Sequence, residues 1–398
     1  TSLLGVSPPE DWESKDNIPF MSTGPSAWPW KHRERHPKNR YPVPTMIARK
    51  AEKWEASLPA AIESAEKEWS RLREINTWEE DRVQEYRDVQ KRINKEKLTN
   101  PEKEAHFARV FQLLHLKNVE MAEEYQKWKA RVVYGGNDVQ DQEDMAAMFQ
   151  EINSCPSSME AAKLALSYGL LKNHTVQTAD AKQAYTQALM DNSVIENWIE
   201  LPESQWPASW FDPNTGAKLY YRPVVPLRLA LYGHQNSGGY WEMHCEKNLR
   251  EAGFVEVPNW RSCFWHAKLK ILLVVYVDDF MLAGPEESMA EAWKLIQKDY
   301  HSSATPETAA KPRSEKQGIE LDPVVDGDKQ RFLGCVHHFS EKTSPITGKL
   351  VRACEFDMQQ FLEACVKRYI ELAQTEYDRQ GRDKHKVSLK KMTTPFID

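Results

Sequence analysis

Apolar side chains recur along the chain at two spacings, one typical of helices and one typical of strands. Apolar residues from Ile62 to Leu72 share one helical face, so a helix is predicted to begin near Ser57, with Pro59 in its first turn and Trp69 in the core. The capping box Ser157-x-x-Glu160 predicts a second helix that ends near residue 169. Further helices are predicted to end near residue 253, to carry an apolar face over 289–300, and to span 356–375.

Shorter apolar runs between glycine, proline or polar residues predict strands. These runs cover residues 110–114, 131–134, 271–277 and 331–336, and the β-branched segment 175–178 predicts a further short strand. The run at 271–277 is continuously apolar, which indicates a strand buried on both faces. Residues 78–104 fit a charge-rich helix or loop, and the polar, proline-containing residues 301–329 fit a flexible loop.

Two adjacent carboxylates, Asp278 and Asp279, follow the apolar run, and a second apolar run follows them. This pattern predicts a hairpin with both carboxylates at its tip. Carboxylates held together at the end of a dry strand repel each other, and a divalent cation between them relieves the repulsion. Hard oxygen ligands suit Mg²⁺. The same residues also fit a polar hairpin turn, since aspartate is common in turns.

Composition and charge change this picture little. The 398 residues are enough for two or three globular domains, and no apolar stretch reaches the roughly 18 residues of a membrane helix. The N-terminus lacks a signal-peptide pattern, and a chain that begins at Thr1 is expected to be part of a longer polypeptide. The net charge of -6 argues mildly against nucleic-acid binding, but a local basic groove matters more than the total.

Cysteines and basic clusters leave alternatives open. Six cysteines without a C-x-x-C pair fit a reducing compartment. Zinc could be bound by residues of the right types, although their spacing matches no strong zinc pattern; they are His244, Cys245, Cys263 and His266. The basic patch at 31–36 either contacts phosphates or is a solvated tail, and the same choice holds for the basic residues at 379–391.

A third carboxylate makes the acidic hairpin more informative. Asp180 follows the strand predicted at 175–178, and Tyr185 comes five residues later. Three aspartates at neighbouring strand ends can bind two Mg²⁺ ions about 3.5–4 Å apart. Such a pair of ions activates a hydroxyl nucleophile and stabilises a pyrophosphate leaving group in phosphoryl transfer.

Ordered sequence blocks around these aspartates resemble the reverse transcriptases of copia-type (Pseudoviridae) LTR retrotransposons. Asp180-Ala181-Lys182-Gln183-Ala184-Tyr185 resembles the family's D-x-K-x-A-[FY] block, and Tyr276-Val277-Asp278-Asp279 resembles its Y-V-D-D block. Other matching blocks follow in family order: Glu68-Trp69, Thr77-Trp78, 129–133, 198–202, Leu231-Tyr232-Gly233, Gly253-Phe254, 263–265, Phe332-Leu333-Gly334 and Thr394-Pro395. The resemblance is strong over 129–398, fair over 58–128 and absent before residue 58.

The resemblance implies a role for each matching residue. Asp180 and Asp278 would hold two Mg²⁺ ions, for which Mn²⁺ could substitute, and Asp279 would assist near the primer 3′-hydroxyl. Tyr185 would lie under the sugar of the incoming nucleotide and select deoxynucleotides; it could instead be a core residue.

Further residues would contact the triphosphate, the base and the primer. Lys129 and Arg131 would neutralise the triphosphate, although Arg131 could also be a solvated residue at a strand edge. Tyr232 and Gly233 would form the floor of the nucleotide pocket. The contacts to the primer and template would come from Tyr276, Phe332, Leu333 and Gly334.

The fold implied by the resemblance is an α+β right-hand polymerase with an antiparallel-sheet palm, fingers of helices and strands, and a helical thumb. Residues 1–57 would be a proline-rich arm or linker and 58–179 N-terminal helices and fingers. Residues 180–334 would form the palm with a finger insertion at about 200–240, and 335–398 the thumb and the start of the connection.

The implied function is that of an RNA-directed DNA polymerase. Its expected partners are an RNA or DNA template-primer, deoxynucleoside triphosphates and the RNase H and integrase parts of a Pol polyprotein. No membrane partner is expected, and the expected location is cytoplasmic, in a virus-like particle, or nuclear. One departure favours an inactive or domesticated nucleic-acid-binding remnant: residues 234–239 lack the family's usual lysine and arginine. An RNA-templated RNA polymerase would share the metals, but Tyr185 disfavours it.

Overall fold

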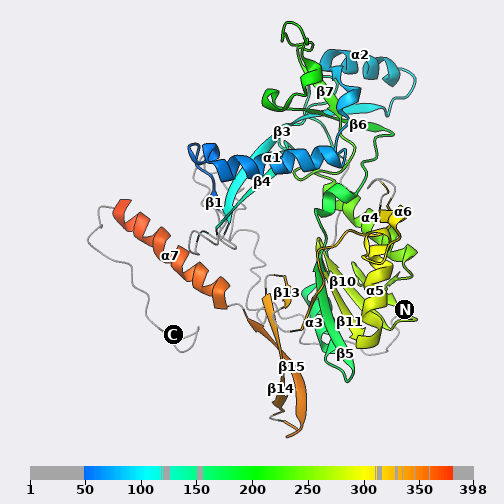
Figure 1. Cartoon of the computed structure of the whole chain (residues 1–398), viewed down its shortest axis with the longest axis vertical. Helices are drawn as coiled ribbons and strands as arrows, with labels where there is room; N and C mark the ends of the chain where they lie inside the picture. The colour runs from blue at the N-terminus through cyan, green and yellow to red at the C-terminus, as the bar shows by residue number, and fades with distance from the viewer. Residues whose placement is uncertain are drawn as a thin grey trace, which may run out of the picture. The chain divides into compact units, whose positions relative to one another are not determined.

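The computed structural model describes most of the chain after its N-terminal arm (Figure 1). The described residues are 49–117, 119, 126–149, 156–309, 311, 316–327, 330–333, 335–344, 346–357 and 359–379. The predicted arm up to residue 48 lies outside this part, as do Cys155, Gly334, Thr394-Pro395 and the basic residues after Arg379.

One six-stranded sheet, called the β5 sheet below, carries the acidic hairpin (Figure 1). Its strands lie in the order β12-β5-β11-β10-β9-β8, and all of its pairings are antiparallel. The strands are β5 (His174–Asp180), β8 (Val255–Glu256), β9 (Cys263–His266), β10 (Ile271–Tyr276), β11 (Asp279–Pro285) and β12 (Val325–Asp326).

Helices cover both faces of the β5 sheet. On one face, α4 (Ser237–Glu251) and α5 (Glu286–Gln297) bury Leu273 and Val275 of β10. On the other face, α3 (Met159–Gly169) buries Val274. Successive residues of β10 therefore point into two different cores, which is why the strand has to be apolar throughout. The prediction of a strand buried on both faces is confirmed.

A second six-stranded sheet, called the β3 sheet, is built mainly from earlier residues. Its order is β1-β3-β6-β7-β2, and β4 also pairs with β3. β3 and β6 are parallel, and the other pairs are antiparallel. The strands are β1 (Arg49–Lys50), β2 (Gln84–Glu85), β3 (Glu104–Lys117), β4 (Lys127–Tyr134), β6 (Ile195–Glu200) and β7 (Pro223–Pro226).

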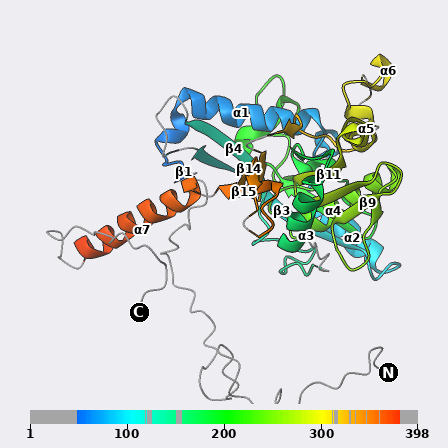
Figure 2. The same cartoon turned by 90° about the horizontal axis from the view of Figure 1, so that it is seen from below.

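Two helices pack against the β3 sheet. α1 (Pro59–Glu74) runs beside β4 (Figure 2), where the Ser64 hydroxyl donates to the carbonyl of Trp128 at 3.2 Å. Its Pro59 start and the core position of Trp69, which is 3% exposed, confirm the predictions for this helix. Ile62 is 42% exposed and does not join that core. α2 (Tyr86–Lys97) shares a core with β3 and β6.

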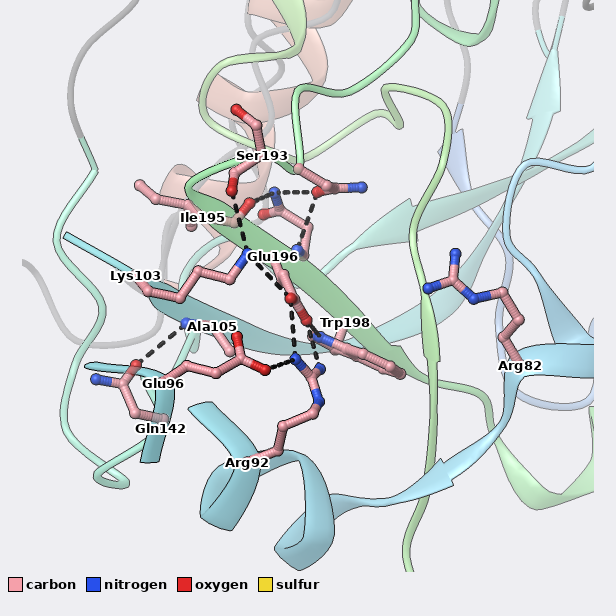
Figure 3. Close-up of polar contacts among 12 residues, drawn as sticks. Arg82, Arg92, Glu96, Lys103, Ala105, Gln142, Ser193, Ile195, Glu196 and Trp198 are labelled. Atoms are coloured by element: carbon pink, nitrogen blue, oxygen red, sulfur yellow. Dashed lines mark hydrogen bonds and ion pairs between the residues drawn. The ribbon is translucent and has the colours of Figure 1, made fainter. Parts of the chain in front are cut away.

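A polar network fastens α2 to β3 and β6 (Figure 3). The carboxylate of Glu196 accepts from the Arg92 guanidinium at 2.6 Å and from the Trp198 indole at 3.0 Å, and lies 3.0 Å from the Lys103 ammonium. Burial alone would raise the pKa of Glu196, but these donors outweigh it and lower the pKa to about 2. The network fixes the helix against the parallel pair of strands.

The C-terminal third contains a three-stranded sheet and a long helix. β13 (Gln330–Phe332), β14 (Cys335–Thr343) and β15 (Leu350–Asp357) pair in that order, and α7 (Gln359–Arg379) follows. The single strand predicted over 331–336 was wrong, because the chain turns between Phe332 and Cys335. The segment expected to be a helical thumb therefore begins with a hairpin.

Three further predictions need correction. The cap of α3 is Ser158, whose hydroxyl accepts from the Ala161 N–H at 3.2 Å, so the helix starts one residue later than the capping box at Ser157 predicted. The loop at 301–329 contains α6 (Pro306–Ala309) and β12, and it buries Ile319 in the core of the β5 sheet. Hydrophobic anchors spaced two residues apart in a polar segment were too sparse to predict this. The predicted boundary at 179/180 falls inside β5.

Candidate active site

Three aspartates meet at one end of the β5 sheet. Asp279 is the first residue of β11 and lies directly opposite Asp180, the last residue of β5. Asp278 occupies the two-residue turn between β10 and β11, and its carbonyl accepts from the Ala181 N–H at 2.7 Å. The structure thus brings together the three carboxylates that the sequence singled out.

The carboxylates perturb one another strongly. Burial, followed by the charges of Asp278 and Asp180, raises the pKa of Asp279 to about 7. Burial and the charge of Asp278 also raise the pKa of Asp180, while its hydrogen bond with Asp279 lowers it. These directions describe a protonated Asp279 that donates to Asp180. A backbone hydrogen bond from Leu333 partly offsets the shift at Asp279.

The donor set is that of a hard cation. Its oxygens come from adjacent strand ends, and their mutual repulsion is what a divalent ion would relieve. The hydrogen bond between Asp180 and Asp279 closes this pair on itself, and no group of three metal-binding side chains is assembled within the described residues. Asp180, Asp278 and Asp279 therefore supply the kind of oxygen donors that suit Mg²⁺, but their side chains as placed here do not form its site.

Two tyrosines and an arginine adjoin the acidic end. Tyr185 lies in a 3-10 turn (Ala184–Gln187) after β5, and its ring centroid is 4.7 Å from that of Tyr232. The Arg131 guanidinium lies 4.4 Å from the Tyr232 ring centroid. Burial raises the pKa of both tyrosines, and the charge of Asp278 contributes to both shifts. Tyr185 and Tyr232 therefore lie within reach of the charge of Asp278, and Arg131 adjoins Tyr232.

Gly233 is required by the chain itself. Its φ is 94°, and a Cβ at this position would lie 2.2 Å from the carbonyl oxygen of Tyr134. Gly136 has the reciprocal constraint, since its Cβ would lie 2.1 Å from the Gly233 carbonyl oxygen. Two glycines thus let the segment after Tyr232 cross closely over the end of β4. A role of Gly233 against a nucleotide base stays a prediction.

A basic face extends outward from Arg131. Side chains on the face of the β3 sheet opposite Leu114 and Ala130 include Lys129, which lies opposite His115, and Lys127, which lies opposite Lys117. Lys50 of β1 continues the row beside His115. The full set, called the basic face below, is Lys50, His115, Lys117, Lys127, Lys129 and Arg131.

The cations of the basic face raise the local positive potential. Burial, followed by the charges of Lys117 and Arg131, lowers the pKa of Lys129 to about 8. Burial and the charge of Lys50 lower the pKa of His115. Within the described residues none of the five lysine and arginine side chains of the basic face forms an ion pair. Glu68, whose charge reaches Lys129, is paired with Arg71. Lys50, His115, Lys117 and Lys127 were not predicted from the sequence. The K-x-K-x-R spacing over 127–131 could have indicated Lys127, but Lys50, His115 and Lys117 join the face only through strand pairing.

The residues predicted to contact the primer are arranged around the turn after β13. Leu333 has a φ of 52°, and its N–H reaches Asp279. Phe332 is 3% exposed and packs under the β5 sheet with Val274, so it anchors the hairpin. Tyr276 is exposed at the end of β10. Gly334 lies outside the described residues.

Two residues near the aspartates were not singled out from the sequence. The Asp322 N–H donates to the Asp180 carbonyl at 2.8 Å, and its charge raises the pKa of Asp180 after burial and Asp278. The Trp241 indole N–H donates to the carbonyl of Val277 at 2.6 Å. No spacing along the chain relates either residue to Asp180, Asp278 and Asp279. Both reach the site from distant parts of the chain.

The zinc alternative finds no support in the described residues. Cys245 and Cys263 are both buried, and burial raises the pKa of the Cys263 thiol to about 11, which opposes the thiolate that zinc needs. In the part of the chain that the structure covers, no three histidine, cysteine or acidic side chains are grouped for a metal.

Comparisons with known proteins give little. No protein-family model and no curated protein matches the chain. Among solved structures, the chain is similar to telomerase from Candida albicans in complex with a TWJ fragment of telomeric RNA, with 9% identity and a TM-score of 0.25. The match covers 67% of this chain and 49% of that chain, so this chain spans about half the length of its neighbour. A likeness this weak assigns neither a family nor an activity.

None of the helices in the described ranges combines the length and apolar character that a membrane span requires.

Proposed function

We propose that this chain is the polymerase core of an RNA-directed DNA polymerase of the copia type. In this proposal the β5 sheet is the palm, the β3 sheet belongs to the fingers, and β14, β15 and α7 begin the thumb. The main support is the convergence of Asp180, Asp278 and Asp279 beside Tyr185, Tyr232 and Arg131. That support is geometric and chemical, and it adds to the ordered sequence blocks.

The three aspartates would hold two Mg²⁺ ions, with Mn²⁺ as a substitute. When bound, the ions would supply positive charge to the transferred phosphoryl group and its leaving group. The raised pKa of Asp279 supports this assignment, because a carboxylate that is unfavourable when alone becomes favourable beside a cation.

The proposed reaction joins a deoxynucleotide to a primer. The primer 3′-oxygen forms a bond to the α-phosphorus, and the bond from that phosphorus to the bridging oxygen of the β-phosphate breaks. Pyrophosphate leaves with the electron pair of that bond, and the hydroxyl proton passes to solvent water. Arg131 and Lys129 would face the triphosphate, and the adjoining Tyr185 and Tyr232 rings, tilted at 54° to each other, would support the sugar and base. Leu333, Phe332 and Tyr276 would place the primer end.

The basic face supports a nucleic-acid partner despite the net charge of -6. Five lysine and arginine cations on one side of a sheet, without ion pairs among the described residues, repel one another, and a bound polyanion removes that repulsion. Phe111 is exposed on the same side of β3, and an exposed aromatic ring can stack on a base. Association with RNase H and integrase parts of a polyprotein, in a virus-like particle or nucleus, belongs to the same proposal.

Primer extension tests the proposal. We expect the wild-type chain to extend oligo(dT) on poly(rA) with Mg²⁺ or Mn²⁺, and Asp278→Asn to lose at least about a thousandfold of the rate, since it removes one carboxylate of the metal site. Asp88→Asn, the same change on the exposed side of α2, should keep wild-type activity. Equal extension by Asp278→Asn and wild type would exclude the metal assignment.

A second candidate is a non-catalytic nucleic-acid-binding remnant of the same fold. One observation favours it: the segment after Gly233 serves the fold, because His234 is buried and its imidazole contacts Asn197 at 3.2 Å. The segment therefore presents no basic side chain comparable to the family's lysine and arginine. Binding of poly(rA)/oligo(dT) without any extension in Mg²⁺ or Mn²⁺ would favour this candidate.

A further inference from the structure

The turn that carries Asp278 has an unusual backbone. Tyr276 and Asp279 pair across two turn residues, and the first of these, Val277, has a φ of 58°. A positive φ at the first central position alone is the pattern of a type II′ turn, where glycine is the usual residue. A β-branched residue is strained in that conformation. Such strain persists only where the surrounding structure holds it in place.

Trp241 supplies the hold on this turn. Its indole N–H donates to the Val277 carbonyl at 2.6 Å, and the indole is 3% exposed in the core shared by α4, α5 and the β5 sheet. The ring also stacks on His244, one turn along α4, with an interplanar angle of 27°. Core packing and the contact with His244 therefore hold the Trp241 indole N–H in a fixed position beside the turn.

The helix that carries Trp241 is also fastened to the floor of the predicted nucleotide pocket. α4 begins at Ser237, whose hydroxyl donates to the Leu231 carbonyl at 2.6 Å. Leu231 is followed directly by Tyr232 and Gly233. One rigid helix thus connects the segment beneath the predicted nucleotide to the turn that carries the metal-binding aspartates.

We infer that Trp241 is a positioning residue: its indole N–H clamps the Val277 carbonyl and thereby holds Asp278 and Asp279 in the arrangement that cations and primer require. This inference rests on the proposed function for its consequence in catalysis. The clamp itself is a property of the fold, and it is measurable without activity.

Trp293 offers a matched control. Its indole N–H donates to the Gln177 side chain at 2.8 Å, it is 3% exposed, and it belongs to the same core as Trp241. Trp→Phe at either position removes one buried indole donor and a similar volume. Only Trp241 reaches the turn, so a general loss of packing would affect both variants alike.

The rate of hydrogen exchange at the Ala181 amide measures how firmly the turn is held, because that amide donates to the Asp278 carbonyl. We expect Trp241→Phe to speed this exchange about tenfold and to weaken Mn²⁺ binding by about three- to tenfold, the size of one lost hydrogen bond. Trp293→Phe should match wild type in both. Val277→Gly added to Trp241→Phe should restore Mn²⁺ affinity, since glycine adopts the positive φ without strain.

Replacement of Trp241 by benzothienylalanine keeps the ring shape and removes the N–H, so it decides the question if Trp241→Phe does not fold. Equal exchange and Mn²⁺ affinity in the Trp241 and Trp293 variants, or no rescue by Val277→Gly, would overturn the inference while wild-type primer extension leaves the proposed function intact. The opposite outcome is a wild-type chain that extends no primer, together with faster exchange of the Ala181 amide in Trp241→Phe. That outcome would support the Trp241 clamp and contradict the proposed polymerase function.

Discussion

The centroids of the Tyr185 and Tyr232 rings lie 4.7 Å apart at an interplanar angle of 54°, and burial, with a contribution from the charge of Asp278, raises the pKa of both phenols. A residue this close to the acidic end, with its ring held by a second aromatic side chain, cannot move aside for a larger sugar without losing that contact. The steric-filter role at the sugar 2′ position stays a prediction, because Tyr185 also packs, partly buried, against two hydrophobic cores, as the alternative of a core tyrosine requires.

We expect Tyr185→Val to raise ribonucleotide incorporation relative to deoxynucleotide incorporation by about ten- to a hundredfold, a difference of ~1.4–2.8 kcal/mol in transition-state binding. Single-nucleotide extension with paired dNTP and NTP substrates measures the ratio. Tyr185→Phe keeps the ring and should keep the wild-type ratio. If both variants match wild type, Tyr185 is not the filter.

At the scale of elements, the β3–β4 pair places alternate residues on opposite sides. One side packs on α1 through Leu114 and Ala130, and the other carries the basic face. Two residues along a strand span about 6.6 Å, so Lys127 to Arg131 covers about 13 Å, longer than one triphosphate needs. The outer cations, Lys117 and Lys127, are therefore expected to meet nucleic-acid phosphates.

We predict that Lys117→Gln combined with Lys127→Gln weakens binding of single-stranded oligonucleotides and reduces the slope of log K against log salt by about 1.4, or about 0.7 per lost phosphate contact. Fluorescence anisotropy across a salt series measures this slope. The control is Lys91→Gln with Lys95→Gln on the exposed side of α2, which changes the net charge equally. The same loss of slope in the control pair would show a general charge effect and contradict a local binding face.

At the scale of the whole molecule, the clustered aspartates lower the free energy of unfolding at pH values where Asp279 is charged. The pKa of Asp279 is about 7 in the folded chain against an ordinary value of 3.8. Between about pH 4 and pH 7 the folded state holds a proton at Asp279 that the unfolded state has lost. The contribution of this group to stability is therefore full below about pH 4 and is lost as the pH rises through 7.

We expect Asp279→Asn to be more stable than wild type at pH 8 by about 1–2 kcal/mol, a figure reduced for the partial exposure of the carboxyl, and to gain little at pH 4.5. Urea denaturation of both proteins at each pH measures the difference. Saturating Mg²⁺ should narrow the gap at pH 8 by stabilising the wild type. A gap independent of pH would contradict the assigned titration.

Two buried histidines make stability depend on pH in the opposite direction, and their effects cancel when wild type and Asp279→Asn are compared. Burial lowers the pKa of His234 to about 4 and also lowers that of His106, so both resist protonation in the folded state. Their contribution to stability falls as the pH drops below about 6.5. Because both histidines are present in wild type and in Asp279→Asn, the difference between the two proteins reports on Asp279 together with its hydrogen-bonded partner Asp180.

The predictions that the structure confirms share a physical basis. The apolar run of β10, the start of α1 at Pro59 and the core position of Trp69 depend on local periodicity and on backbone rules that act within a few residues. The errors arose where long-range packing decided the outcome. Leu333 has a φ of 52° and turns the predicted strand back on itself, and Ile319 is buried by contacts that its polar neighbours conceal.

By itself, the sequence determined that three carboxylates end two apolar strands and that an aromatic residue follows the first of them, because strand ends and residue spacing are local properties. Only the tertiary structure decided which distant residues surround these carboxylates. Trp241 meets Val277 from 36 positions away, Asp322 returns to Asp180 from a polar segment, and Lys50 joins the basic face through β1. Such contacts depend on how helices and strands pack, and packing brings together residues that share no spacing along the chain.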